Sequence, residues 1–194
     1  GKLIGKIDLD IARSNPNVLY AMVEAPGAEG GLYRSNDAGA TWAMVNNSQR
    51  LRARPFYFNY VNVNPKNENE VWVNELGLHK STDAGKTWTL MGLEQTSRIP
   101  RLIVHPKDPD TVLACALGHA YGPQQERGVF RTTDGGKTWT RTLFTDENSG
   151  CSDIAMDAKN PRILLAGMWT LEIHTWGRDS GGPGSGLFMS RDGG

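Results

Sequence analysis

Two aspartates at matched positions of a repeated segment are the residues best suited to catalysis. Asp8 and Asp153 stand three residues before Ile11 and Met156, each near the start of an expected first strand. Two carboxylates can hydrolyse a glycosidic bond, with retention at a separation of about 5 to 5.5 Å and inversion at about 6.5 to 9.5 Å. We therefore expect Asp8 and Asp153 to be the catalytic candidates. In the alternative, each carboxylate accepts a hydrogen bond in a turn or from a neighbouring blade.

Two long polar segments, residues 118–128 and 170–186, are the expected binding loops. They combine aromatic rings with amide, carboxylate and guanidinium groups, which suits a glycan or a peptide. In the alternative, the two loops pack on each other and seal a gap between blades. The candidate ligand-binding residues are His119, Tyr121, Gln125, Glu126, Arg127, His174, Trp176, Arg178 and Asp179.

The remaining reactive side chains do not form a pattern typical of a metal or nucleophile site. The four histidines, at positions 79, 105, 119 and 174, lack the paired spacing of zinc ligands. No Gly-x-Ser-x-Gly motif is present. We expect no metal and no cofactor.

A short phrase that recurs every 46 to 58 residues predicts the elements that position these side chains. It reads Ser/Thr-x-Asp-x-Gly-x-Thr-Trp and is cut short at its fourth occurrence. Asp and Ser side chains bond nearby backbone amides, and Gly supplies a positive φ, so each phrase predicts a hairpin turn with a structural role. Its residues are Asp37, Gly39, Trp42, Asp83, Gly85, Trp88, Asp134, Gly136, Trp139 and Asp192.

This period indicates an all-β chain of β-propeller blades, each a four-stranded antiparallel sheet. We expect one partial propeller domain over 1–194, with blades at about 5–46, 56–92, 98–144 and 151–194. The last blade lacks its fourth strand, so we expect its edge to be covered by further blades of a longer parent chain or of a second copy. The expected strands are 7–11, 18–23, 32–34 and 42–45; 57–63, 71–75, 78–80 and 88–91; 99–104, 112–117, 129–131 and 139–143; 152–156, 163–168 and 187–190.

Composition excludes some partners. The formal net charge is zero and no basic patch is present, so we expect no nucleic-acid binding. No apolar run reaches the roughly 20 residues of a membrane span. The start at Gly1 and the stop inside a repeat predict a fragment.

The two cysteines are too few for a disulfide framework. Cys115 lies in an apolar stretch and is most simply interpreted as a small buried apolar residue, whereas Cys151 opens the next blade. A disulfide between them is the less favoured alternative.

The repeated phrases resemble the Asp boxes, or BNR repeats, of sialidases, sortilin-type (VPS10) propellers and xyloglucanase-like glycoside hydrolases. Residues 99–106, 116–123, 126–139 and 181–186 are similar to bacterial secreted proteins described as sortilin-like or BNR-repeat glycosyl hydrolases. The resemblance implies a secreted or periplasmic protein. In that group the blade resembling 5–42 follows the segment resembling 182–194, so we expect the order to break near Met91 and Gly92.

The resemblance also bears on the enzymatic alternatives. In xyloglucanase-like enzymes an aspartate pair works in a cleft between two propellers, although neither enzyme motif can be matched here residue by residue. Arg98-Ile99-Pro100 resembles the Arg-Ile-Pro of sialidases, whose arginine binds a carboxylate.

Three functions follow from these patterns. The first is a non-catalytic extracellular module that binds a glycan or a protein segment through its long-loop face. The others are a glycoside hydrolase portion and a structural blade array of a larger assembly.

Overall fold

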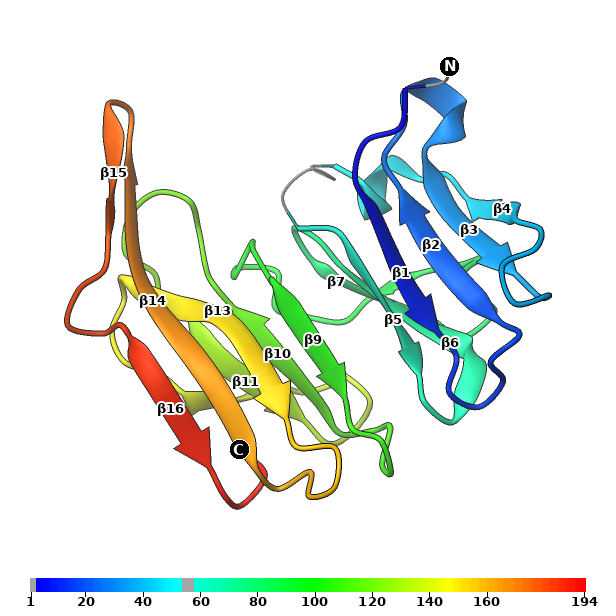
Figure 1. The fold of residues 1–194 in the computed structure, drawn as a ribbon. Helices are drawn as coiled ribbons and strands as arrows, with labels where there is room; N and C mark the ends of the chain where they lie inside the picture. The colour runs from blue at the N-terminus through cyan, green and yellow to red at the C-terminus, as the bar shows by residue number, and fades with distance from the viewer. Residues whose placement is uncertain (1–2, 54–57) are drawn as a thin grey trace. The chain divides into compact units, whose positions relative to one another are not determined.

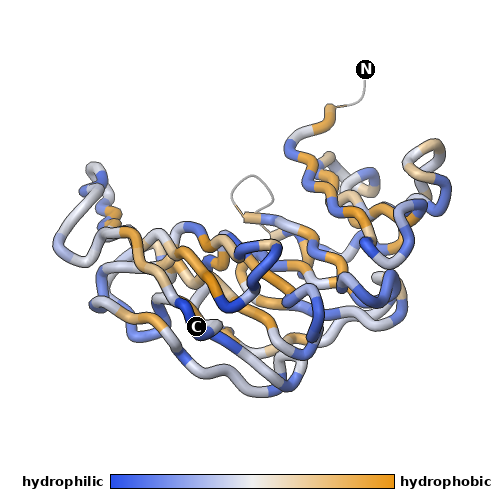
Figure 2. Tube along the Cα trace, turned by 60° about the horizontal axis from the view of Figure 1, so that its bottom comes forward, coloured by the Kyte–Doolittle hydropathy of each residue, from blue (hydrophilic) through white to orange (hydrophobic). Residues whose placement is uncertain are grey.

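The computed structural model describes residues 3–53 and 58–194, and nearly all of its regular structure is β. The chain divides into two compact units, Gly1–Met91 and Gly92–Gly194. Each unit holds two antiparallel sheets of four strands (Figure 1). Hydrophobic and hydrophilic stretches alternate along the chain (Figure 2). The all-β blade architecture expected from the repeats is therefore confirmed.

The first unit contains two complete blades. The strands of the first blade pair in chain order: β1 (Ile7–Ile11), β2 (Leu19–Val23), β3 (Gly31–Ser35) and β4 (Ala43–Asn46). The second blade repeats that order with β5 (Tyr60–Asn64), β6 (Asn67–Asn74), β7 (Leu78–Ser81) and β8 (Thr89–Leu90). Short 3-10 turns occupy Gly27–Glu29 and Gln49–Leu51.

The second unit contains one complete blade and one modified blade. The complete blade pairs β9 (Arg101–Val104), β10 (Val112–Ala116), β11 (Gly128–Thr132) and β12 (Thr140–Leu143). In the other, β14 (Leu164–His174) pairs with β13 (Ser149–Met156) and with β16 (Gly186–Ser190). The far end of β14 also pairs with β15 (Gly177–Ser180). In each of the other three sheets, the third strand pairs with a fourth. Among the described residues, β16 has no such partner.

The strand boundaries differ from expectation in three places. Strands β4, β8 and β12 begin one residue after Trp42, Trp88 and Trp139, so each Trp belongs to the turn. Residues 170–186, expected to be a loop, instead include part of β14 and the whole of β15. The strand expected over 57–63 begins at Tyr60, and residue 57 lies outside the described residues.

Each unit has its own apolar core between its two blades. In the first, Tyr20, Met22 and Leu32 of one blade pack with Val61 and Val71 of the next. Core residues of one strand, such as Tyr20 and Met22 of β2, lie two positions apart because alternate side chains of a strand face the same side.

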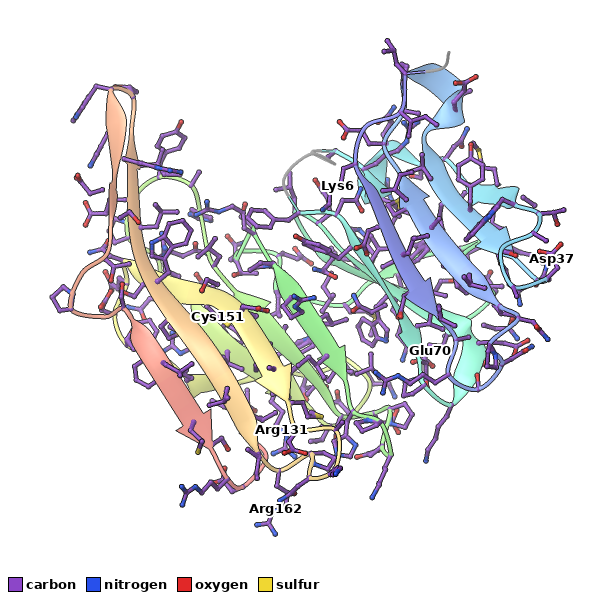
Figure 3. The ribbon with its side chains drawn as sticks, in the orientation of Figure 1. Lys6, Asp37, Glu70, Arg131, Cys151 and Arg162 are labelled. Carbon is purple, nitrogen blue, oxygen red and sulfur yellow. A yellow bond between two sulfur atoms is a disulfide. The ribbon has the colours of Figure 1, made fainter. Side chains whose placement is uncertain are left out.

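The core of the second unit contains a disulfide. Cys115 of β10 and Cys151 of β13 are fully buried and bonded, with a Cα–Cα distance of 5.0 Å (Figure 3). The favoured expectation of a free buried thiol is therefore wrong. Strand pairing within each blade is local, but the approach of β10 to β13 depends on how two blades pack. The bond links residues 36 apart in sequence and joins the third blade to the fourth.

Across residues 3–53 and 58–194, no helix has the length and apolar character needed to cross a membrane.

Candidate functional site

Each Asp box closes its turn with bonds among its own residues. In the first box Ser35 Oγ donates to Asp37 Oδ1 at 2.7 Å, and Gly39 N donates to Ser35 Oγ at 2.9 Å. The Thr41 hydroxyl donates to Asp37 Oδ2 at 2.5 Å, and Trp42 Nε1 donates to the Gly39 carbonyl at 3.0 Å. The hydroxyl–carboxylate bond recurs at 2.6 Å in the second and third boxes. The box carboxylates are thus engaged in their own turns.

These bonds lower the pKa of the box aspartates. The hydroxyl of Thr41, followed by its backbone amide, lowers the pKa of Asp37 to about 2. The side chain and amide of Thr87 lower the pKa of Asp83 to about 2 in the same way. Donors that bond the ionised form stabilise the charge. The box aspartates therefore remain ionised across the neutral range.

The chief candidate site lies at the far end of β14, where this strand and β15 form a projecting hairpin (Figure 1). The register runs from Leu171 opposite Ser180 to His174 opposite Gly177, which leaves a two-residue turn at the tip. Trp169 Nε1 donates to Ser180 Oγ at 3.0 Å, and the amide of Gly181 donates to the Thr170 carbonyl at 2.9 Å. These bonds tie the base of the hairpin to the blade.

The hairpin tip presents an aromatic pair. The rings of His174 and Trp176 are stacked with centroids 5.0 Å apart and planes at 5°. Trp176 is 84% exposed, so one of its faces is open to a ligand. His174 Nε2 lies 3.3 Å from Asp179 Oδ2 and 4.0 Å from Glu172 Oε2. Asp179 is therefore within hydrogen-bond distance of the histidine that stacks on the indole, Glu172 lies farther off, and Arg178 is exposed on the same hairpin.

The connection between β10 and β11 is organised around Arg127. This residue is 1% exposed, and its guanidinium donates to the carbonyls of Leu117, His119, Gly122 and Asn148 at 3.0 to 3.3 Å. Burial lowers the pKa of Arg127, while Asp146 and Glu172 act in the opposite direction. The side chain is buried and both terminal nitrogens of its guanidinium bond carbonyls of the protein, so they are not accessible to a ligand. The expected ligand role of Arg127 is thus replaced by a positioning role.

Other predicted residues of this connection divide between scaffold and surface. Gln125 Nε2 donates to Glu147 Oε1, and the Glu126 carbonyl accepts from Thr96 Oγ1 at 2.6 Å. The carbonyl of His119 accepts from Arg127 and also from Arg98. Tyr121 is 62% exposed, and His119 of the same connection is exposed as well.

Both long segments bond to the stretch between β12 and β13, which the sequence interpretation did not single out. Gln124 N donates to the Glu147 carbonyl at 2.9 Å, and Leu171 N donates to the Asn148 carbonyl at 3.3 Å. Ser149 Oγ lies 2.6 Å from Thr170 Oγ1. No local motif marks these residues, because their bonds link segments about 20 residues apart. The bases of the two loops are therefore joined through a third segment, while their aromatic tips stay exposed.

The two catalytic candidates have bonding partners that are consistent with the inter-blade alternative. Asp8 Oδ2 accepts from the amide of Val61 in the next blade at 2.7 Å. Asp153 Oδ1 accepts from Arg101 Nε and from the amide of Ile154, both at 2.9 Å. The two aspartates belong to different compact units. Arg98, the sialidase-like arginine, donates to the Gly118 carbonyl at 2.7 Å.

Within residues 3–53 and 58–194, no three His, Cys, Asp or Glu side chains are grouped so as to hold a metal ion.

Comparison with known proteins decides the family. Residues 30–165, more than half of the chain, match the family described as sortilin, neurotensin receptor 3. The chain belongs to the Sortilin-Vps10 family. The matched residues span the second, third and part of the first and fourth sheets of this Sortilin-Vps10 chain, including three Asp boxes. No curated protein matches the chain over its sequence.

Solved structures with similar folds are propeller proteins. The GH74 xyloglucanase from Xanthomonas campestris is 20% identical with a TM-score of 0.66, over 98% of this chain and 29% of that one. The GH74 enzyme from Niastella koreensis is 20% identical with a TM-score of 0.65, over 84% of this chain and 26% of that one. YCF48 bound to D1 peptide is 16% identical with a TM-score of 0.53, over 92% of this chain and 54% of that one. At these identities the likeness shows the fold, and the chain spans about a quarter of the GH74 proteins.

Proposed function

We propose that this chain is a non-catalytic extracellular propeller module that binds a glycan or an extended protein segment through the β14–β15 hairpin and the connection between β10 and β11. The single observation that carries the proposal is the 84% exposed Trp176 stacked on His174. A large aromatic ring that is held at the tip of an ordered hairpin loses little entropy on binding.

The arrangement of polar groups supports recognition of a ligand with both apolar faces and hydrogen-bonding groups. Glu172 and Asp179 lie beside His174 of the aromatic pair, Arg178 is exposed on the same hairpin, and Tyr121 provides a second exposed ring in the same unit. Sugar rings and peptide side chains both stack on aromatic faces. The peptide bound to the similarly folded YCF48 supports the protein-segment form of the proposal.

A glycoside hydrolase portion is the second candidate, because two of the similar folds belong to GH74 proteins. The carboxylates of Asp8 and Asp153 already bond the partners described above. An inter-blade acceptor needs no substrate, so we favour the binding module.

The disulfide supports an extracellular or periplasmic location. Structural disulfides persist in oxidising compartments and are rare in the cytosol. Cys115 and Cys151 are fully buried, which protects the bond from exchange.

A glycan array and a peptide array, followed by titration calorimetry of each hit, test the proposal. Trp176→Ala should weaken binding about fivefold to thirtyfold, because stacking and the area that the ring buries together contribute about 1 to 2 kcal/mol. Leu76→Ala is the matched control, since Leu76 is a 37% exposed apolar residue in the corresponding connection of the second blade. It should leave affinity unchanged.

Polysaccharide hydrolysis is measured on the same preparations. Release of reducing ends that Asp8→Asn and Asp153→Asn both abolish would establish the hydrolase in place of the module. Binding that is insensitive to Trp176→Ala would refute the proposed site. Absence of any ligand on both arrays would favour the structural blade array.

A further inference from the structure

The β14–β15 hairpin has two faces that differ in charge. Side chains alternate between the faces of a strand, so Glu172 and His174 of β14 lie on the same face as Asp179 of β15. Ile173 and Arg178, which are opposite each other in the register, lie on the other face. Within residues 171–180 the basic side chains are His174 on the first face and Arg178 on the second. The first face, with Glu172, His174 and Asp179, is called the acidic face below.

The two carboxylates of the acidic face stand directly opposite each other. Glu172 pairs with Asp179 in the register, and like charges at opposed positions destabilise an antiparallel pair. The imidazole of His174 approaches both, with Nε2 at 3.3 Å from Asp179 Oδ2 and 4.0 Å from Glu172 Oε2. One imidazole compensates at most one of the two negative charges. The acidic face therefore favours an added cation.

The buried guanidinium of Arg127 does not remove this excess of negative charge. Burial lowers the pKa of Arg127, and the charges of Asp146 and Glu172 both oppose that effect, so two carboxylates share one buried cation. Arg127 is 1% exposed, and its terminal nitrogens bond backbone carbonyls. The side chain of Asp179 is 80% exposed. A positive charge that approaches from solvent thus meets Asp179 first.

The exposed indole beside the acidic face is suited to the same kind of ligand. The imidazole of His174 stacks on one face of the Trp176 ring, with the planes at 5°, and Trp176 is 84% exposed. The face of an indole is electron-rich and attracts cations, most often the guanidinium of an arginine. A guanidinium is planar and weakly hydrated, so it can lie flat on a ring and still bond a carboxylate, whereas an ammonium is a strongly hydrated point charge.

We propose that Trp176 and the acidic face bind an arginine side chain of an extended protein segment. The inference rests on the proposed binding function and names the class of its ligand. The guanidinium lies on the open face of the indole, and Asp179 and Glu172 compensate its charge. Arg178 is on the opposite face of the hairpin and does not compete for this place.

The test uses the full chain and a labelled peptide with blocked ends, Gly-Arg-Ser-Arg-Gly. Fluorescence anisotropy should show saturable binding that weakens as the salt concentration rises. The same peptide with citrulline in place of both arginines keeps nearly the same shape without the charge, and it should bind about fivefold or more weakly. A lysine version should bind more weakly than the arginine peptide, because its ammonium cannot cover the ring.

Charge-removing variants of the chain identify the carboxylates. Asp179→Asn and Glu172→Gln preserve side-chain volume, and each should weaken binding of the arginine peptide about threefold while leaving the citrulline peptide unaffected. Asp110→Asn is the matched control, because it removes the same charge from an exposed residue in the turn between β9 and β10 of the same unit. This control should leave binding unchanged. All three side chains are exposed, so the fold does not depend on them.

Absence of saturable binding at millimolar arginine peptide would overturn the inference, as would equal binding of the arginine and citrulline peptides. If array hits then still depend on Trp176, the proposed binding function stands and the ligand class alone is wrong. Tighter, Asp179-dependent binding of a chitosan oligosaccharide would assign the cation to an amino sugar instead. Failure of every array hit to depend on Trp176 would refute the proposed function itself.

Discussion

Loss of the Cys115–Cys151 disulfide should destabilise the second unit and leave the first unchanged. The bond closes a loop of 36 residues. In the chain-entropy description, crosslinking a loop of this length reduces the entropy of the unfolded chain enough to contribute about 4 kcal/mol at 25 °C. A contribution of this size is a large share of the stability of one small unit.

Hydrogen exchange read by mass spectrometry measures the effect unit by unit. Oxidised protein, protein held in reductant, and a Cys115→Ala, Cys151→Ala variant are compared in native buffer. Peptides from β10, β11, β13 and β14 should lose protection in the last two samples by about 4 kcal/mol of opening free energy, whereas peptides from β2, β3, β6 and β7 should not change. The two samples should agree to within about 1 kcal/mol, since each Cys→Ala change removes little volume.

Unchanged protection in the second unit on reduction would contradict this prediction. A joint loss of protection in both units would contradict it as well, because the stabilisation would not then be local to the crosslinked loop.

Three further changes test the geometry directly. Asp37 and Asp83 have pKa values of about 2 in the folded chain, below the ordinary value of 3.8. Their ionised carboxylates therefore stabilise the fold above pH 4, and this stabilisation is lost as the pH falls from about 4 to about 2. Carboxyl carbon NMR titration and acid unfolding would show this, and a titration midpoint near 4 would contradict it. Arg127→Met should cost about 2 to 4 kcal/mol because four carbonyls lose a buried donor, and it should expose the connection between β10 and β11 to protease; an unchanged urea midpoint would count against this role. Gly128→Ala should lower the free energy of unfolding by about 2 kcal/mol or more, because the φ of Gly128 is +110° and an added Cβ would overlap the carbonyl oxygen of Leu143. A Cβ at Gly177 would meet nothing within 4 Å, so Gly177→Ala is the control and should be near neutral in thermal unfolding. Equal effects of the two changes would refute the steric explanation.

Sequence was sufficient for the blades because the signals that define them are local. The Asp box bonds within seven residues, from Ser35 to Thr41, so its turn is specified wherever the phrase occurs. Its spacing of 46 to 58 residues then gives the length of chain that is available to each blade. The position of Trp42 in the turn was missed by one residue, since its indole bonds the Gly39 carbonyl before the strand begins.

The candidate site was only partly accessible from sequence. Tyr121 and Trp176 were expected at exposed positions, and both are exposed. Strand β15, whose four residues Gly177–Ser180 are all exposed, has none of the alternating apolar pattern that predicts a strand. It forms because β14 runs on past its neighbours and offers a free edge.

The amino-acid sequence by itself determined the repeat, its turns and the resemblance to a family. The recurring phrase is visible in the sequence, and its turns form through contacts between residues that are close along the chain. Tertiary structure decided the rest. Cys115 reaches Cys151 only when two blades pack, and Arg127 is enclosed only when its own connection folds around the guanidinium and the Asn148 carbonyl of a distant segment approaches it. Such contacts depend on the packing of distant segments, which leaves no local pattern in the sequence.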